Sequence, residues 1–439
     1  MSFVPHTDPE RAAMLKGIGV SSIEDLFSDI PEHLRIEGLA LPGAVSEIEA
    51  IDEVETLADR NVQTKDMDWF LGAGAYYGYI PAVVPALAGR GEFLTAYTPY
   101  QPEVSQGTLQ AIFEYQSMTA KLLGMSVVNA SHYDGATALA EAVLMAWKAK
   151  EGRNRIFLPK DLHPEYSQVI ATYCTSFDIE FIRYEGDPAQ APIDESTAAI
   201  IIAYPGFSGE MYPISKASEK AHEKGALCIV QADPLMCAIF KSPGEQGADI
   251  VTAEGQCLGN PLNFGGPYLG MMGTTDALIR RMPGRIVGQT KDKFGKRGFV
   301  LTLSTREQHI RREKAVSNIC SNQGLSMLQT CIYLATLGKN GLQEVAKQSY
   351  DKAHYAAQLI DIIPGYHVVP KLFFREFLVE TPDSATKIVE ALNNKSIMPG
   401  LALSHYYPER ANELLICVTE MNTKAQIEKL ASALKEAVK

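Results

Sequence analysis

The chain has 439 residues, of which 46% are hydrophobic and 21% charged, and its formal net charge is -12. These values are typical of a soluble globular protein with roughly two to three domains. The acidic balance argues against nucleic acid or an anionic membrane as the main partner. No apolar run reaches the roughly 18 residues of a membrane span, and the first residues, MSFVPHTDPE, show no signal-peptide pattern.

The seven cysteines are scattered along the sequence, and none forms a CxxC pair with the spacing of a metal site. Most of them lie in apolar surroundings, where a buried reduced thiol is the usual state. We therefore expect free thiols, no metal site and a cytoplasmic location.

Residues 1–65 are predicted to form a helical arm. The segment Val45–Arg60 carries an apolar residue at every third position, which places a stripe along one face of a helix. The members of this stripe are Val45, Ile48, Ile51, Val54 and Leu57.

Residues 66–330 alternate short apolar runs with helical stretches, which predicts a large α/β domain with a mostly parallel sheet. The predicted strands are Arg155–Leu158, Glu180–Arg183, Ala199–Tyr204, Ala226–Ala232 and Asp249–Ala253, and the predicted helices are Asp134–Lys150, Pro164–Cys174 and Ser215–Lys224. Ligands of such sheets bind beyond the carboxyl ends of the strands. The positions that this rule singles out are Asp134, Tyr204–Ser208, Asp233 and Glu254–Gln256.

Residues 331–439 are predicted to form a smaller α+β domain. A helix opens it, and the elements expected after that helix are strands Tyr366–Val369 and Leu372–Glu380, helix Ala385–Leu392, strand Leu414–Val418 and helix Lys424–Val438.

Two acidic residues at predicted strand and helix ends are candidates for ligand contacts. Asp233 follows the run Ala226–Ala232, where a carboxylate could stabilise a protonated ring nitrogen of a cofactor, or could simply end a strand in an Asp-Pro turn. Asp134 opens an Ala-rich helix, and a plain N-cap is the favoured interpretation because a carboxylate would repel a phosphate there.

Three loops are unusual in composition. The segment Gly259–Pro267 is a Gly-rich turn after the last predicted strand, which could admit a ligand or another chain, or could be a simple tight turn. The segments Thr95–Gly107 and Lys296–Arg312 combine Tyr and Arg with hydrogen-bonding side chains. Such a composition fits a ligand pocket or a subunit interface, and it does not choose between them.

These segments resemble the glycine dehydrogenase (decarboxylating) family, the P-protein of the glycine cleavage system. The resemblance covers nearly the whole chain and is carried by the strings TAYTPYQPEVSQG, NASHYDGATALAEA, QCLGNPLNFGGPYLG and GKRGFVLTLSTREQHIRREKAVSNICSNQG. The length of the chain matches the separate amino-terminal-type subunit, subunit 1, of enzymes that are split into two homologous chains.

The resemblance implies an aspartate-aminotransferase-like (fold type I) pyridoxal-phosphate enzyme fold and an α2β2 assembly with the homologous catalytic subunit 2. The complex would decarboxylate glycine through a pyridoxal phosphate aldimine. It would then transfer the methylamine group to the lipoyl group of the H-protein.

One position departs from the family pattern. Counting back eleven residues from Pro267 gives Gln256 where the catalytic homologous chain has its Schiff-base lysine. Because glutamine cannot form a Schiff base, we expect no covalently bound cofactor in this chain, and we expect the isolated chain to be inactive. Lys241 lies outside the matching position, and the lysines of the 291–296 segment, Lys291, Lys293 and Lys296, belong to a different, polar stretch.

The resemblance therefore implies that the partner's lysine holds pyridoxal phosphate while this chain supports the partner's site. The candidate contributors are Tyr97, Thr98, Tyr100, Gln101 and Gln106. The vestigial cofactor positions are Asp134, Asp233, Gln256, Gly265 and Gly266. For Arg306, His309 and Arg311 we favour a role in interface structure over catalysis.

Three hypotheses remain open from the sequence. The chain could be a non-catalytic subunit that completes an active enzyme. It could be an independent pyridoxal-phosphate enzyme that uses another lysine. It could also be a purely structural or regulatory subunit without any contribution to an active site.

Overall fold

The structure is a computed structural model that describes residues 5–36, 38–95, 97–315 and 317–437. By its internal contacts the chain divides into two units, Met1–Val62 and Gln63–Lys439, and each is described by itself. The predicted segments include positions outside the described residues: residues 1–4 and Glu37 of the arm, Ala96 and Val316 of the large domain, and Val438 and Lys439 of the small domain.

The described residues of the first unit form two α-helices, α1 (Asp8–Ile18) and α2 (Glu47–Ala58), and two short 3-10 helices, Glu24–Phe27 and Glu32–Leu34. Each α-helix begins with a capping box, in which an N-cap side chain and a glutamate three residues later exchange hydrogen bonds with backbone N–H groups. Four residues of the predicted stripe, Ile48, Ile51, Val54 and Leu57, lie on α2, whereas Val45 precedes the helix, and all five side chains are exposed. No residue of either α-helix is buried.

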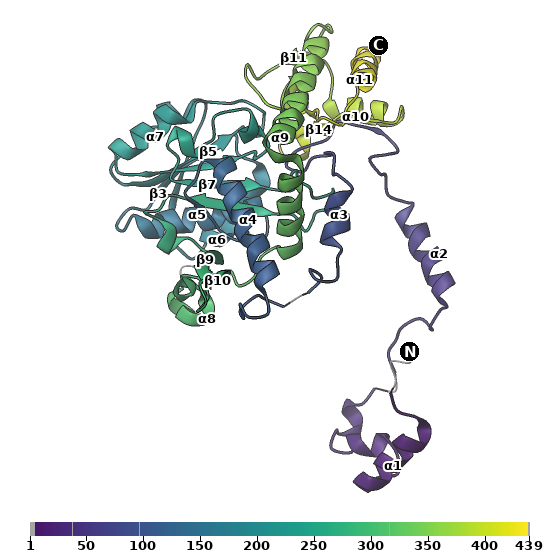
Figure 1. The fold of residues 1–439 in the computed structure, drawn as a ribbon. Helices are drawn as coiled ribbons and strands as arrows, with labels where there is room; N and C mark the ends of the chain where they lie inside the picture. The colour runs from purple at the N-terminus through teal and green to yellow at the C-terminus, as the bar shows by residue number, and fades with distance from the viewer. Residues whose placement is uncertain (1–4, 37, 96, 316, 438–439) are drawn as a thin grey trace. The chain divides into compact units, whose positions relative to one another are not determined.

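The second unit is built on a seven-stranded sheet with the order β2-β8-β7-β6-β5-β3-β4 (Figure 1). Its strands are β2 (Val127–Val128), β3 (Arg155–Pro159), β4 (Glu180–Tyr184), β5 (Thr197–Tyr204), β6 (Leu227–Ala232), β7 (Ile250–Glu254) and β8 (Gly270–Thr274). The five predicted strands are confirmed, and they pair in parallel.

Two strands of this sheet escaped prediction. β8 pairs antiparallel with both β7 and β2. The turn Gly259–Pro267 therefore precedes one more strand, and its placement after the last strand was wrong. β8 contains glycines in place of the usual β-branched residues, because neighbouring side chains pack closely against it. A Cβ on Gly273, for example, would lie 3.0 Å from the side chains of Met125 and Val128.

Helices cover both faces of the sheet, and alternate residues of each strand enter different cores. Ile156, Leu158 and Ile201 pack with α5 (Gly135–Ala149) and α6 (Pro164–Cys174). Phe157 and Ile200 pack with the core of the opposite face. That face is covered by α4 (Gln106–Leu123), α7 (Ile214–Glu223) and the first part of α9 (Gly324–Asp361). Three layers result, as expected for an α/β domain.

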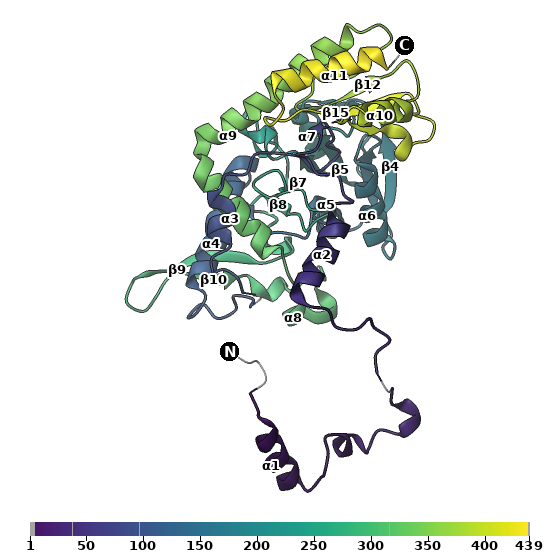
Figure 2. The same cartoon turned by 90° about the vertical axis from the view of Figure 1, so that its right-hand side faces the viewer.

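A second, antiparallel sheet has the order β11-β12-β15-β14. Its strands are β11 (His367–Val368), β12 (Glu376–Glu380), β14 (Leu401–Ala402) and β15 (Glu413–Cys417), which pack with α10 (Ala385–Asn393) and α11 (Lys424–Glu436) (Figure 2). The strand predicted at Leu372–Glu380 begins later, at Glu376, because the residues before it are irregular. The preceding residue, Arg375, is buried.

The remaining elements connect these sheets. α9 runs through both regions and is interrupted at Gly338, whose φ of 57° and ψ of -171° are not helical. Short elements complete the unit: α3 (Val83–Ala88), α8 (Gln308–Arg311), the hairpin of β9 (Ile286–Lys291) and β10 (Arg297–Thr302), and the parallel pair of β1 (Asp68–Trp69) and β13 (Ile397–Met398). No helix within the described residues is long and apolar enough to cross a membrane.

Candidate functional site

A small cavity lies where parallel strands β5, β6 and β7 end, at the position that the sequence predicted for a ligand. Its volume is about 80 Å³, and it is lined by Asp233, Glu254, Glu376, Tyr76 and His163 among others. Pockets for small molecules usually measure about 300–1,000 Å³. The cavity is thus much smaller than an ordinary cofactor site.

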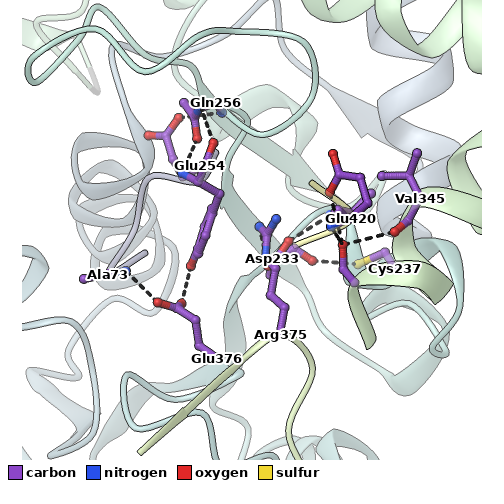
Figure 3. A network of polar contacts seen from close by, with 12 residues as sticks. Ala73, Asp233, Cys237, Glu254, Gln256, Val345, Arg375, Glu376 and Glu420 are labelled. Carbon is purple, nitrogen blue, oxygen red and sulfur yellow. Dashed lines mark hydrogen bonds and ion pairs between the residues drawn. The ribbon is translucent and has the colours of Figure 1, made fainter. Parts of the chain in front are cut away.

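Asp233 lies at the carboxyl end of β6 as predicted, but its carboxylate is paired inside the chain. Its Oδ2 lies 2.6 Å from Nη2 of Arg375, and both residues are buried (Figure 3). Its Oδ1 accepts a 2.9 Å hydrogen bond from the backbone N–H of Leu235. Burial is the largest single effect and would lower the pKa of Arg375, but the carboxylate of Asp233, together with smaller contributions from Cys257, Tyr76 and Cys417, outweighs it and holds that pKa above its ordinary value.

Tyr76 fills the space beside this ion pair. The guanidinium of Arg375 lies 3.5 Å from the centre of the Tyr76 ring, which is a cation–π contact. The Tyr76 hydroxyl donates to Glu376 Oε2 at 2.6 Å, and the backbone N–H of Ala73 donates to Glu376 Oε1 at 2.5 Å. Burial raises the pKa of Tyr76 and of Glu376, so the tyrosine stays a neutral donor to the carboxyl group.

Gln256 has its whole carboxamide engaged within the chain. Its Oε1 accepts from the backbone N–H of Tyr76 at 2.8 Å, and its Nε2 donates to the carbonyls of Tyr76 at 3.1 Å and Asn260 at 2.8 Å. The Gln256 side chain therefore holds the backbone of Tyr76 against the end of β7. In this way it fixes the position of Tyr76, which lines the cavity.

Glu254 anchors the neighbouring backbone at the same strand end. Its carboxylate accepts hydrogen bonds from the N–H groups of Gly135, Gln256 and Leu269 at 2.8–2.9 Å. These bonds favour the charged form, yet burial is the larger effect and raises the pKa of Glu254 to about 7.

The other positions predicted to be vestigial make contacts within the chain or lie in a turn. Asp134 is the N-cap of α5, as favoured from the sequence, and its Oδ1 accepts from Thr137 N at 2.7 Å. Gly265 and Gly266 have φ values of 102° and 126°, which only glycine adopts readily. Neither glycine is among the residues that line the cavity.

A second, larger hollow lies beside the segment Thr95–Gly107. Its volume is about 540 Å³, and Tyr97, Thr98, Arg285 and the first residues of α9 line it. Tyr97 donates to Gln101 Oε1 at 3.0 Å. The ring of Tyr100 lies between Arg285, at 5.5 Å, and the edge-on ring of His309, at 5.7 Å. The two polar loops singled out from the sequence thus meet around Tyr100.

Gln106 and Arg306 tie these loops to the neighbouring backbone. The Gln106 carboxamide exchanges hydrogen bonds with the backbone N–H and carbonyl of Phe299 at 2.9 and 2.8 Å, which ties α4 to β10. Arg306 donates to the carbonyls of Met282, Gly284 and Leu303. His309 and Arg311 are exposed.

Sequence reasoning missed Tyr76, Arg375 and Arg285. The first two lie far along the chain from β6, so no local pattern links them to Asp233. Arg285 precedes the apolar start of β9, where an arginine reads as an ordinary solvent-facing residue, but it is only 6% exposed. A buried cation of this kind could have been found only by its tertiary burial.

Comparison with known proteins gives concordant results. The family model described as glycine cleavage system P-protein matches residues 1–434. A probable glycine dehydrogenase (decarboxylating) subunit 1 of Thermomicrobium roseum is 47% identical over 446 residues, covering 100% of both chains. The crystal structure of a glycine decarboxylase (P-protein) of the glycine cleavage system in inhibitor-bound form has a TM-score of 0.92 and 41% identity, again covering 100% of both.

A more distant likeness concerns the fold alone. An aspartate aminotransferase of Thermus thermophilus superposes with a TM-score of 0.59 at 12% identity, over 84% of this chain and 99% of its own. The predicted aspartate-aminotransferase-like fold with a mostly parallel central sheet is therefore confirmed.

Proposed function

Since this chain belongs to the P-protein family of the glycine cleavage system, we propose that it is the subunit of a two-subunit glycine decarboxylase that does not hold the cofactor. The partner is the homologous subunit 2, whose lysine binds pyridoxal phosphate. The complex decarboxylates glycine and passes the methylamine group to the lipoyl group of the H-protein.

The small cavity at the ends of β5–β7, of about 80 Å³, carries this proposal. Pyridoxal phosphate would need an amine for its aldehyde, a free carboxylate for its ring nitrogen and room for the ring. Gln256 stands at the lysine position of the family pattern and is fully hydrogen-bonded, and no described lysine lines the cavity. Asp233 is committed to Arg375, and Tyr76 fills the space beside them. These residues do not fit the cofactor.

The loop around Tyr97, Thr98 and Tyr100 supports a contribution to the partner's site. Its side chains line an accessible hollow of about 540 Å³ or flank it, and Tyr97 and Tyr100 are about half exposed, at 54% and 46%. The Tyr97 hydroxyl already orders Gln101, so that pair acts as one polar unit. Gln106 would act indirectly, by fixing the end of this loop against β10.

Within the partner's site, these residues would bind and orient the substrate and exclude water. The hydroxyl groups of Thr98 and Tyr100, and the amide N–H groups of the Gln101 side chain that Tyr97 holds, can donate hydrogen bonds to the glycine carboxylate or to the cofactor phosphate. The cofactor, when bound in the partner, supplies the electron sink for decarboxylation.

A mixing experiment tests the proposal. The full chain alone should show no reducible, yellow chromophore with pyridoxal phosphate, and glycine-dependent CO2 exchange should require both subunits. A chromophore on this chain alone would favour an independent enzyme. Full exchange by subunit 2 without this chain would favour a purely structural or regulatory role.

The loop contribution is tested separately with Tyr100→Phe in the assembled complex. Loss of a hydroxyl that contacts a charged group should lower kcat/KM by roughly tenfold, while Tyr79→Phe, an exposed tyrosine outside the hollow, should leave it unchanged. Intact assembly with wild-type exchange in the Tyr100 variant would remove this residue from the proposal.

A further inference from the structure

Arg285 is a buried cation that the proposed function has not used. It is 6% exposed, and its Nε is buried without a hydrogen-bond partner in the described part of the chain. Its Nη2 donates to the Cys320 carbonyl at 2.5 Å, and longer contacts of 3.5 Å reach the Tyr100 hydroxyl and Asn322 Oδ1. None of these partners carries a negative charge.

A buried guanidinium with these partners lacks part of the interaction energy that would offset the cost of its desolvation. Burying a charge is costly unless an opposite charge and enough hydrogen bonds compensate for it. No ion pair joins Arg285 to a carboxylate among the described residues, whereas Arg375, the other deeply buried arginine discussed above, is paired with Asp233 at 2.6 Å. A negative charge that offsets the burial of the Arg285 guanidinium must therefore come from a group other than the described side chains.

The start of α9 adds a second group of donors at the same place. The helix begins at Gly324, no side chain caps it, and its first helical hydrogen bond is donated by Met327 to Gln323. The N–H groups of Gly324, Leu325 and Ser326 thus have no acceptor within the described chain, as is usual for an uncapped first turn. Gly324, Leu325 and Arg285 line the same hollow of about 540 Å³.

We propose that Arg285 and the first turn of α9 form a binding site for a phosphate-sized oxyanion. A helix N-terminus offers N–H groups and positive potential to an anion, and arginine adds a planar pair of donors. Tyr100 covers the guanidinium from one side by its cation–π contact, so the anion enters from the hollow.

Oxyanion binding by this chain does not rest on the proposed function, but the identity of the anion in the assembled enzyme does. In the assembled enzyme the oxyanion is either the phosphate of the cofactor that the partner holds or the carboxylate of glycine. Both present oxygen atoms that arginine binds in the same forked geometry.

The first experiment uses inorganic phosphate and the full chain without its partner. Phosphate should broaden and shift in phosphorus NMR and should raise the unfolding temperature of the chain, because a ligand of the folded state stabilises it. In Arg285→Gln the affinity should fall by roughly tenfold or more, the loss expected when a charged hydrogen-bond donor is removed. Arg285→Lys, which keeps the charge without the fork, should bind with intermediate affinity.

Arg281→Gln is the matched control, since Arg281 is an exposed arginine four residues away that does not line this hollow. It should bind phosphate as the wild type does. The proposal is overturned if the wild-type chain shows no phosphate binding, or if Arg285→Gln binds as tightly as Arg281→Gln. Circular dichroism of each variant shows whether the fold is kept, and Arg285→Lys decides the matter if Arg285→Gln does not fold.

The assembled complex then identifies the source. If the cofactor phosphate is the ligand, Arg285→Lys should weaken pyridoxal phosphate binding and leave the glycine KM unchanged at saturating cofactor. If the glycine carboxylate is the ligand, the glycine KM should rise and cofactor affinity should stay constant. Either result supports the site, and no change in both quantities overturns its use in the enzyme even if phosphate binds. Failure of the mixing experiment above would leave phosphate binding by the free chain intact, so the two proposals fail separately.

Discussion

Arg375 is a buried cation beside the cavity of the large sheet. Its guanidinium pairs with Asp233 and lies over the ring of Tyr76, so one side chain contacts two of the residues that line the cavity. A buried ion pair is costly to break from one side because the remaining charge stays buried.

Replacing Arg375 by Met should therefore lower the free energy of unfolding by about 3–5 kcal/mol, because Asp233 is left unpaired. Urea unfolding followed by circular dichroism measures this change. Arg90→Met removes an exposed partner of Glu92 and should cost less than about 1 kcal/mol. Equal losses in the two variants would contradict the role assigned to Arg375.

Glu254 predicts a dependence of stability on pH. Its pKa is raised in the folded chain from an ordinary value of 4.5 to about 7, so between these values the folded state holds a proton that the unfolded state has released. The contribution of Glu254 to the free energy of unfolding is therefore largest below pH 4.5. It falls as the pH rises to about 7, by about 3 kcal/mol in total.

The measurement compares wild type with Glu254→Gln across that window. The variant has no titrating group there, so its stability relative to wild type should rise with pH by that amount, whatever the constant offset from altered hydrogen bonds. A difference that is flat between these pH values would contradict the raised pKa.

At the scale of elements, the two sheets approach each other closely enough for direct backbone contacts beside the Asp233–Arg375 ion pair. Gly209 follows β5 and has a φ of +93°, and a Cβ there would lie 2.2 Å from the backbone oxygen of Glu376 in β12. Next to it, Leu378 N donates to Ser208 O at 3.1 Å. Glycine is required both for the left-handed conformation and for the close approach.

Gly209→Ala should destabilise the chain by about 2–5 kcal/mol, as the sum of backbone strain and overpacking. Gly152→Ala is the matched control, because Gly152 has a φ of +80° with nothing within 4 Å of the added Cβ. It should cost only the strain, about 1–2 kcal/mol. Thermal unfolding compares the two, and equal shifts would mean that the β5–β12 approach tolerates a methyl group.

At the scale of the whole molecule, every hydrophobic core in the described residues belongs to the second unit. The cores draw no residue from Met1–Val62. The fold of Gln63–Lys439 should therefore be independent of the first unit.

Deleting residues 1–62 should leave the unfolding midpoint and the near-ultraviolet circular dichroism of the chain within measurement scatter. Full-length protein treated identically is the control. A fall of several kcal/mol in stability would show that the first unit contributes to the core after all.

Periodicity and composition predicted much of this molecule. The buried runs of β3, β5, β6 and β7 and the amphipathic α6 are local patterns, because a strand covered on both faces needs consecutive apolar residues and a covered helix needs a periodic stripe. The Asp134 N-cap and the presence of a cavity beside Asp233 also follow from local rules. The family followed from long, specific sequence strings, and Gln256 was singled out from the same strings.

Tertiary structure decided what those positions do. β8 escaped prediction because its glycines suit close packing and dilute the apolar signal, and Arg375, inside the predicted strand Leu372–Glu380, instead lies just before β12 and pairs with Asp233. Tyr76 contacts Arg375, Gln256 hydrogen-bonds to the Tyr76 backbone, and the buried Arg285 contacts Tyr100. Each of these contacts joins residues that are far apart in the chain. Local sequence specifies which residues can be buried or can end a strand, whereas the pairing of buried charges depends on which distant side chains the fold brings within a few ångströms.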